Sequence, residues 1–186
     1  KMGFSIAKAA VDESAIVTLI SGPVTLETPE RVKRIDIESA EEMKEHVTAN
    51  LSDIDLFIST AAVADFKMKN AESQKIKKGQ SKNMSLSLEK NEDILKHVSD
   101  NNPDLKIVGF AAETENMIDN ARKKLSSKNL NLIVANDVSD SSIGFDSNNN
   151  EVTLITEKEE LKILKTSKEK VARKIVQFIS KNILND

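Results

Sequence analysis

Short apolar runs alternate with stretches of helical periodicity along most of the chain. The apolar runs are rich in Val, Ile and Leu and have the length of buried strands: residues 15–20, 55–59, 107–110 and 132–135, with 32–37 as a further short candidate. Between them, helical patterns span residues 39–51, 91–100 and 115–128. The alternation predicts an α/β, Rossmann-like fold in which helices cover both faces of a mostly parallel sheet.

The C-terminal third has a different pattern. Residues 151–156 and 161–164 predict a pair of antiparallel strands, which follow an Asn-, Ser- and Asp-rich stretch at residues 139–150. Ser167 is then placed to cap a helix, because apolar side chains recur at helical spacing after it: Val171, Ile175, Phe178 and Ile179. We expect the chain to end in an antiparallel strand pair and an amphipathic helix.

Two of the central helices carry N-terminal signals. Ser39 is followed three residues later by Glu42, which is the spacing of a capping box. Asn91 precedes Glu92 and Asp93, whose negative charges favour the positive end of a helix dipole. We predict N-caps at Ser39 and Asn91.

The N-terminal residues begin with a helix. Residues 4–11 have a helical pattern and no strand comes before them, whereas a Rossmann-like unit normally starts with a strand and a Gly-rich turn. The length of 186 residues fits one domain, and no repeat or linker-like stretch divides the chain. We expect a single nucleotide-binding domain over residues 1–186 whose first strand and Gly-rich loop are missing.

Composition argues against several classes of site. The chain has no Cys and two His, which lack the spacing of metal ligands, so thiol and zinc chemistry are disfavoured. A formal net charge of -3 argues against general nucleic-acid binding. No stretch approaches the roughly 20 apolar residues that a membrane span needs, and no signal peptide is apparent. We expect a soluble, cytoplasmic protein.

The strand predicted at residues 55–59 leads into small residues and one carboxylate. Ala61 and Ala62 follow the strand, and Asp65 comes after them. Small residues at the carboxyl end of a strand let a ligand approach the backbone, and a carboxylate there can hold Mg²⁺ with a polyphosphate. In the alternative interpretation, Asp65 lies in a turn and bonds the nearby backbone.

A basic segment comes next. Residues 66–82 contain six Lys and one acidic residue, Glu72. Such a run is by default a solvated surface. Beside a strand end that suits a nucleotide, it would also serve as a lid that keeps water away from a reactive mixed anhydride.

Several short motifs, spread over nearly the whole chain, occur in the order of a known family. They resemble the phosphopantothenoylcysteine synthetases (phosphopantothenate–cysteine ligases) of coenzyme A biosynthesis, in their bacterial CTP-dependent form. The matching motifs are Lys1-Met2-Gly3-Phe4, Ile20-Ser21-Gly22-Pro23, Ala61-Ala62-Val63-Ala64-Asp65-Phe66, Lys75-Ile76-Lys77-Lys78, Val108-Gly109-Phe110-Ala111-Ala112-Glu113-Thr114, Ala135-Asn136-Asp137 and Gly144-Phe145.

The resemblance implies a ligase that joins 4′-phosphopantothenate to cysteine through an acyl-cytidylate, with CTP as co-substrate and Mg²⁺ as cofactor. It implies a homodimer, for which the C-terminal strand pair is a candidate pairing surface. It assigns Asp65 and Lys75 to catalysis, Asp65 also to the metal, and Ala61, Ala62 and Asp65 to phosphopantothenate. The nucleotide-binding residues that it implies are Asp65, Lys75, Glu92, Asp93, Ile94, Leu95, Phe110, Lys124 and Lys128.

Within that set, Lys124 and Lys128 are one helical turn apart. They would present ammonium donors to O2 and N3 of cytosine, while Phe110 would bound the base pocket. Without the resemblance, both lysines would be ordinary surface charges and Phe110 a core aromatic.

Two other classes of function fit an α/β pattern. An NAD(P)-type Rossmann oxidoreductase is disfavoured because no G-x-G-x-x-G motif occurs and the strand at 15–20 ends in Ser21-Gly22-Pro23, with no acid for a ribose. A non-catalytic nucleotide-binding module is the second alternative. Titration with CTP, ATP and NAD separates the three.

Overall fold

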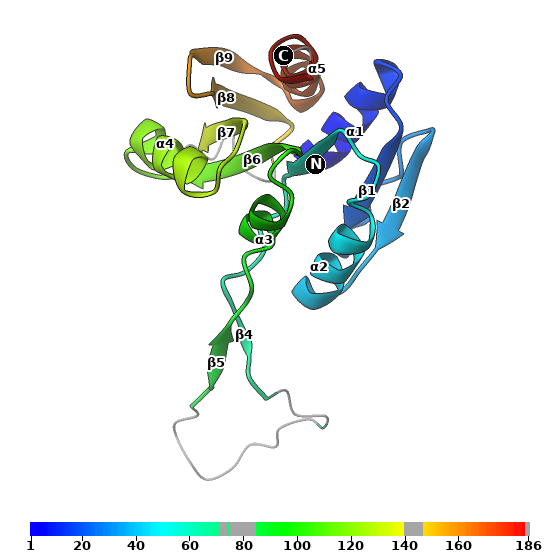
Figure 1. Ribbon diagram of the computed structural model, residues 1–186, viewed down its shortest axis with the longest axis vertical. Coiled ribbons are helices and arrows are strands. Elements are labelled where there is room, and N and C mark those ends of the chain that lie inside the picture. Colours follow the sequence, from blue (N-terminus) through cyan, green and yellow to red (C-terminus); the bar gives the residue numbers. More distant parts are fainter. Residues whose placement is uncertain (71–73, 75–84, 140–146, 185–186) are drawn as a thin grey trace.

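The computed structural model describes residues 1–70, 74, 85–139 and 147–184 (Figure 1). The helices are α1 (Met2–Asp12), α2 (Ala40–Ala49), α3 (Ile94–Asn101), α4 (Met117–Ser127) and α5 (Lys168–Ile179), and α5 continues into a π-helical turn, Ser180–Leu184. The strands are β1 (Val17–Ser21), β2 (Val32–Asp36), β3 (Leu56–Ser59), β4 (Phe66–Met68), β5 (Leu88–Lys90), β6 (Lys106–Glu113), β7 (Leu132–Asp137), β8 (Asn149–Ile155) and β9 (Glu160–Ser167).

The central sheet has the strand order β3-β6-β7-β8-β9. β3, β6 and β7 run parallel, whereas β8 and β9 are antiparallel to their neighbours. The register places Ser59 of β3 opposite Gly109 of β6. The carboxyl ends of β3, β6 and β7 therefore meet at one edge of the sheet, and the predicted α/β fold with a C-terminal antiparallel pair is confirmed.

Helices cover both faces of this sheet. Val108 of β6 belongs to a hydrophobic cluster with residues of α1 and α5, while its neighbour Ile107 belongs to a second cluster with residues of α3 and α4. Neighbouring strand residues point to opposite faces, so one apolar strand supplies both cores. In Figure 1, α4 and α3 lie on one side of the sheet, and α1 and α5 lie on the other.

β1 and β2 form a separate two-stranded parallel sheet. Among the described residues, β1 pairs only with β2, and β3 pairs only with β6. All four residues of β3 are half-buried although Leu56, Phe57 and Ile58 are apolar. A parallel strand is normally buried on both faces, so the incomplete burial of β3 fits its having one neighbouring strand among the described residues.

The predicted helix starts were partly right. Ser39 caps α2, and its hydroxyl accepts the backbone N–H of Glu42 at 3.1 Å. The N-cap of α3 is Asp93, not Asn91, and its carboxylate accepts the backbone N–H of Lys96 at 3.0 Å. The predicted N-cap at Asn91 was wrong, because the side chain of Asn91 instead donates a hydrogen bond to the loop after β3, as described below.

The C-terminal elements follow the sequence pattern. Ser167 caps α5 by accepting the backbone N–H of Lys170. α5 buries Val171, Ile175 and Ile179 against the sheet, as its periodicity predicts. The prediction of one domain over residues 1–186 stays a prediction. No described helix has the length and apolar character needed to cross a membrane.

β4 and β5 form an antiparallel arm that the sequence analysis missed. In Figure 1 the arm projects away from the rest of the molecule. Phe66 pairs with Lys90, and Met68 pairs with Leu88. The start of the predicted lid is therefore a strand. The sequence analysis missed it because the lysine-rich composition hid the alternation of Phe66, Lys67 and Met68. Most of the remaining lid, residues 71–73 and 75–84, lies outside the described residues.

Candidate functional site

Three of the predicted site residues lie at the carboxyl edge of the sheet. Ala61, Ala62 and Asp65 follow β3, and all three are exposed. Glu113 ends β6 and Asp137 ends β7. Because ligands of open α/β sheets bind outside the carboxyl ends of the strands, this edge is the candidate site.

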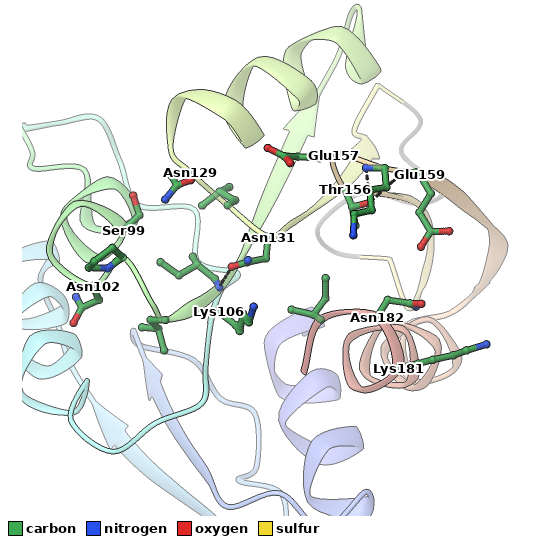
Figure 2. A pocket seen from close by; sticks show the side chains of 16 residues that line it. Ser99, Asn102, Lys106, Asn129, Asn131, Thr156, Glu157, Glu159, Lys181 and Asn182 are labelled. Carbon is green, nitrogen blue, oxygen red and sulfur yellow. Dashed lines mark hydrogen bonds between the residues drawn. The ribbon is translucent and has the colours of Figure 1, made fainter. Parts of the chain in front are cut away.

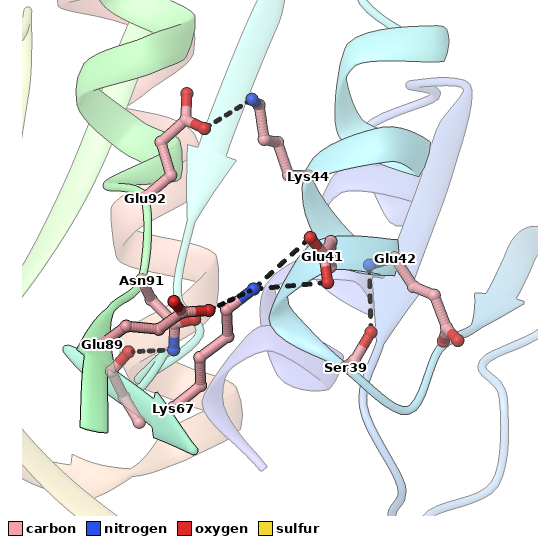
Figure 3. Close-up of polar contacts among 9 residues, drawn as sticks. Ser39, Glu41, Glu42, Lys44, Lys67, Glu89, Asn91 and Glu92 are labelled. Carbon is pink, nitrogen blue, oxygen red and sulfur yellow. Dashed lines mark hydrogen bonds and ion pairs between the residues drawn. The ribbon is translucent and has the colours of Figure 1, made fainter. Parts of the chain in front are cut away.

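The loop after β3 is tied to the segment that precedes α3. The side-chain Nδ2 of Asn91 donates to the backbone oxygen of Ala64 at 2.8 Å (Figure 3). The backbone N–H of Asn91 donates to the backbone oxygen of Asp65, also at 2.8 Å. These bonds engage the backbone of Ala64 and Asp65 and leave the Asp65 carboxylate exposed at the strand end.

The N-terminus of α1 also reaches this loop. A Cβ atom placed on Gly3 would lie 2.6 Å from Oγ1 of Thr60, the residue directly after β3. Only glycine permits so close an approach. The Lys1-Met2-Gly3-Phe4 motif therefore packs beside the candidate site, a role that the sequence alone did not suggest.

Glu92 joins the segment before α3 to α2. Its carboxylate lies 2.6 Å from Nζ of Lys44 on α2 and 3.2 Å from Nδ1 of His97 (Figure 3 shows the lysine contact). The hydrogen bond from Lys44 lowers the pKa of Glu92 below its ordinary value; desolvation opposes this, and the charges of Lys44 and His97 lower it further. Glu92 is ionised and engaged in these contacts at neutral pH.

Asp93 joins α3 to α4. Its carboxylate caps α3 and lies 2.7 Å from Nζ of Lys128. Partial burial raises the pKa of Asp93, but the hydrogen bonds from Lys128 and Lys96 and the charges of Lys128 and Lys90 outweigh it, so the pKa lies below its ordinary value. Two separately predicted nucleotide-binding segments, residues 92–95 and the end of α4, are thus brought together.

Lys124 is held by a residue that the sequence analysis did not select. Oε1 of Glu113 lies 2.6 Å from Nζ of Lys124, and Oε2 accepts a hydrogen bond from Nδ2 of Asn120 at 3.2 Å. The sequence signal for this role was the place of Glu113 within a matching motif, three residues beyond the strand predicted at 107–110.

The apolar members of the predicted site are placed differently. Ile94 is buried and Leu95 half-buried in the cluster between α3, α4 and the sheet. A Cβ atom on Gly109 would lie 2.8 Å from Cδ1 of Leu130 and 3.2 Å from Cδ2 of Leu95, so this glycine lets both leucines pack closely on β6. Phe110 packs on the opposite cluster, with α1 and α5. The structure does not place Phe110 beside Lys124 and Lys128, and their joint base pocket stays a prediction.

The basic segment is described only at its start. Lys67 lies 3.4 Å from the carboxylate of Glu41 and 3.6 Å from that of Glu89 (Figure 3). Lys75, the predicted catalytic lysine, lies outside the described residues, as does Phe145 of the Gly144-Phe145 motif. Their roles stay predictions.

The described carboxylates suit Mg²⁺ as a partner of a bound nucleotide. In the part of the chain that the structure describes, no three His, Asp or Glu side chains gather as a protein-built metal site requires. Mg²⁺ is commonly held by one or two carboxylates together with substrate phosphates and water. The exposed carboxylate of Asp65 fits a cation that arrives with a nucleotide.

A cavity of about 440 Å³ lies at the other end of the strands, beside the amino-terminal ends of β6 and β7 (Figure 2). Three of its asparagine side chains are used locally: Asn131 accepts the backbone N–H of Ile107 at 2.7 Å, and Asn102 and Asn182 donate to backbone oxygens of the helices that precede them. We interpret these groups as helix and turn caps and assign no ligand to the cavity.

Comparison with known proteins decides the family. Residues 1–183 match the family described as the DNA/pantothenate metabolism flavoprotein C-terminal domain. The chain belongs to this family. It is 46% identical over 181 residues to the coenzyme A biosynthesis bifunctional protein CoaBC of Vibrio parahaemolyticus, covering 95% of this chain and 45% of the relative. It is 44% identical over 184 residues to CoaBC of Bacillus subtilis, covering 97% of this chain and 45% of the relative.

A solved structure gives the same result. The crystal structure of the C-terminal domain of a coenzyme A biosynthesis bifunctional protein CoaBC superimposes with a TM-score of 0.83 at 35% identity, over 100% of this chain and 83% of that chain. The chain spans about half the length of the curated relatives that it matches. The family resemblance found in the sequence motifs is confirmed, and the dependence on CTP stays a prediction.

Proposed function

We propose that the chain is a phosphopantothenate–cysteine ligase of coenzyme A biosynthesis. One observation from the structure supports it most directly. Asn91, Glu92 and Asp93 are consecutive, and they contact the loop after β3, α2 and α4, respectively. Segments that the family resemblance assigns separately to substrate, metal and nucleotide are thus linked at the edge where α/β enzymes bind ligands.

The proposed reaction has two steps. The carboxylate of 4′-phosphopantothenate attacks the α-phosphate of CTP and pyrophosphate leaves, which gives an acyl-cytidylate. The amine of cysteine then attacks the acyl carbon and CMP leaves, which gives phosphopantothenoylcysteine. Negative charge accumulates on the oxygens of the α-phosphate and on the leaving pyrophosphate in the first step, so positive groups and a dry site are needed there.

We assign the exposed residues after β3 to the reacting end of the substrates. The backbone amides of Ala61 and Ala62 would bind the phosphate of phosphopantothenate, because small exposed residues leave the backbone accessible. Asp65 would hold Mg²⁺, which when bound neutralises the triphosphate. Lys75 would reach the phosphates from the basic segment.

The nucleotide base is assigned to the region between α3 and α4. In the first turn of α3, the backbone N–H of Lys96 donates to Asp93, while those of Ile94 and Leu95 have no acceptor within the helix, and Lys128 lies against the cap. Lys124 is one helical turn away on α4. These donors match the O2 and N3 acceptors of cytosine, which supports CTP as the co-substrate.

The test is a coupled assay on the intact protein. Phosphopantothenate, cysteine, Mg²⁺ and CTP should together give phosphopantothenoylcysteine, CMP and pyrophosphate, and omission of phosphopantothenate should abolish pyrophosphate release. Binding of CTP without pyrophosphate release would favour the non-catalytic nucleotide-binding module. Tight binding of NAD, with no ligation, would favour the oxidoreductase alternative. A cytoplasmic location stays a prediction.

We also propose a homodimer, and the arm formed by β4 and β5 supports it. Phe66 and Met68 lie on one face of the arm with Leu88, and these three side chains and Leu86 are 41–57% exposed. An apolar face of this kind, on a projecting arm, suits the same face of a second copy.

The predicted pairing surface, the C-terminal strand pair, is less suited to this role. β9 carries a bulge against β8, and Lys162 projects from it to pair with Glu151 at 2.7 Å. Bulges and lysines are features that oppose edge pairing. Light scattering on Leu88→Asp and Leu164→Asp variants compares the two surfaces. A monomer only with Leu88→Asp supports the arm; a monomer only with Leu164→Asp supports the strand pair.

A further inference from the structure

One face of α4 carries three polar residues at successive helical turns, Asn120, Lys124 and Lys128. Each of them contacts a carboxylate from another element. Glu113, at the end of β6, contacts Asn120 and Lys124, and Asp93, at the start of α3, contacts Lys128. The lysines assigned to the base are therefore both ion-paired.

We propose that Glu113 is a positioning residue that sets nucleotide specificity by pairing with Lys124. This inference rests on the proposed function and extends it to a residue with no assigned role. Glu113 fixes the ammonium group of Lys124 and compensates its charge, so that Lys124 offers hydrogen-bond donors to a neutral base instead of a charge to phosphate. Asp93 fixes the ammonium group of Lys128 and compensates its charge in the same way.

The geometry favours a firmly held carboxylate. The Glu113 side chain is 14% exposed, and both of its oxygens have partners, Nζ of Lys124 at 2.6 Å and Nδ2 of Asn120 at 3.2 Å. The backbone oxygen of Glu113 accepts the N–H of Val138 at 3.0 Å, which anchors the residue to the segment after β7. Lys124 is 45% exposed, so its ammonium remains open on the solvent side.

The chemistry of the donors explains the expected selectivity. An ammonium group has three donors and no acceptor, and Glu113 engages one donor of Lys124. The others can meet acceptors such as O2 and N3 of cytosine. Uracil carries a donor at N3, so an ammonium fixed opposite that position rejects it. A lysine without a carboxylate partner would instead be free to turn towards the triphosphate, whose recognition is the same for every base.

A second ion pair on the same helix provides a matched control. Arg122 lies on another face of α4, and its Nε donates to Oε1 of Glu160 at 3.0 Å. Both side chains of that pair are exposed by more than a third, and neither was predicted at the site. Loss of the Arg122–Glu160 pair tests the effect of removing any ion pair from α4.

The experiment measures kcat and KM for CTP and UTP in the intact protein, for the wild type, Glu113→Gln and Glu160→Gln. With Glu113→Gln we expect KM for CTP to rise by about tenfold while kcat changes little, as when one charge-assisted hydrogen bond is weakened. The ratio of kcat/KM between CTP and UTP should fall, and inorganic triphosphate should inhibit more strongly. Glu160→Gln should leave KM, kcat, the CTP to UTP ratio and the inhibition by triphosphate unchanged.

A double-mutant cycle keeps the test decisive if Glu113→Gln lowers stability. In a Lys124→Ala background, Glu113→Gln should have no further effect on the CTP to UTP ratio, because the two residues act as one unit. A Glu113→Gln variant with an unchanged CTP to UTP ratio, or one that lowers the ratio equally with and without Lys124, overturns the proposal. Absence of ligation by the wild type with any nucleotide contradicts the proposed function itself, which separates the two failures.

Discussion

β3 and β7 are both short, apolar, parallel strands of the central sheet, but they are buried to different degrees. Residues 132–135 of β7 are at most 1% exposed, whereas every residue of β3 is half-buried. β7 has β6 and β8 on either side, while β3 pairs only with β6 among the described residues. Similar local sequences thus differ in burial because their neighbours differ. The loop that carries Asp65 follows the less buried of the two strands.

The largest expected effect compares the same substitution in the two strands. Leu132→Ala removes a fully buried side chain and should lower the free energy of unfolding by about 2–5 kcal/mol. Leu56→Ala, at a half-buried position, should lower it by roughly half as much or less. Urea unfolding curves of both variants measure the difference. Equal losses would contradict the view that β3 contributes less to the core.

The next prediction compares the two ends of β3. Asp65→Asn, after the carboxyl end, should reduce kcat for ligation by a factor on the order of 10², because it removes the proposed anchor of Mg²⁺. Asp55→Asn, an exposed position before the amino end, should leave kcat unchanged. Steady-state assays at saturating CTP compare them, and a Mg²⁺ titration should shift only for Asp65→Asn. If both variants keep wild-type turnover, Asp65 is an ordinary turn residue.

A third prediction concerns the close packing of α1 on the loop after β3. Gly3→Ala should destabilise the protein by about 1–3 kcal/mol, since the added Cβ would lie 2.6 Å from Oγ1 of Thr60. Gly22→Ala is the control, because no atom lies within 4 Å of a Cβ there. Thermal melts should show recovery in the double variant Gly3→Ala, Thr60→Ala. No recovery would mean that Thr60 is not the obstacle.

The smallest expected effect is a pH dependence at the junction of α3 and α4. The pKa of Asp93 is lower in the folded state than in the unfolded state, where it is about 3.9. The pairing of Asp93 therefore stabilises the fold fully at pH values above about 3.9, and this stabilisation is lost as the pH falls through the lower, folded-state pKa. Asp93→Asn should therefore lower Tm at pH 7 by more than at pH 3. For a partly exposed pair, the difference should correspond to less than about 1 kcal/mol. If the Tm of Asp93→Asn lies equally far below that of the wild type at pH 7 and at pH 3, the ion pair is not the cause of the difference.

Periodicity and local motifs were sufficient for most of the fold. Apolar runs of strand length correspond to β1, β3, β6 and β7, and Ser39 and Ser167 cap the helices that follow them. These features depend on residues close together in the chain, where side-chain spacing and capping chemistry act directly. The family was also readable, because its motifs are short and contiguous.

Features that depend on distant residues were decided by the tertiary structure. The sequence placed the helix start at Asn91, but the contact of Asn91 with Ala64 leaves Asp93 as the N-cap of α3. The arm strand Phe66–Met68 was hidden because its partner, Leu88–Lys90, lies about twenty residues further on. The pairing of Glu113 with Lys124 joins a strand end to a helix face. The resemblance of short motifs to a known family indicated which residues could bind a nucleotide. Only packing, which brings chain segments together without regard to their separation in sequence, determined which of them meet.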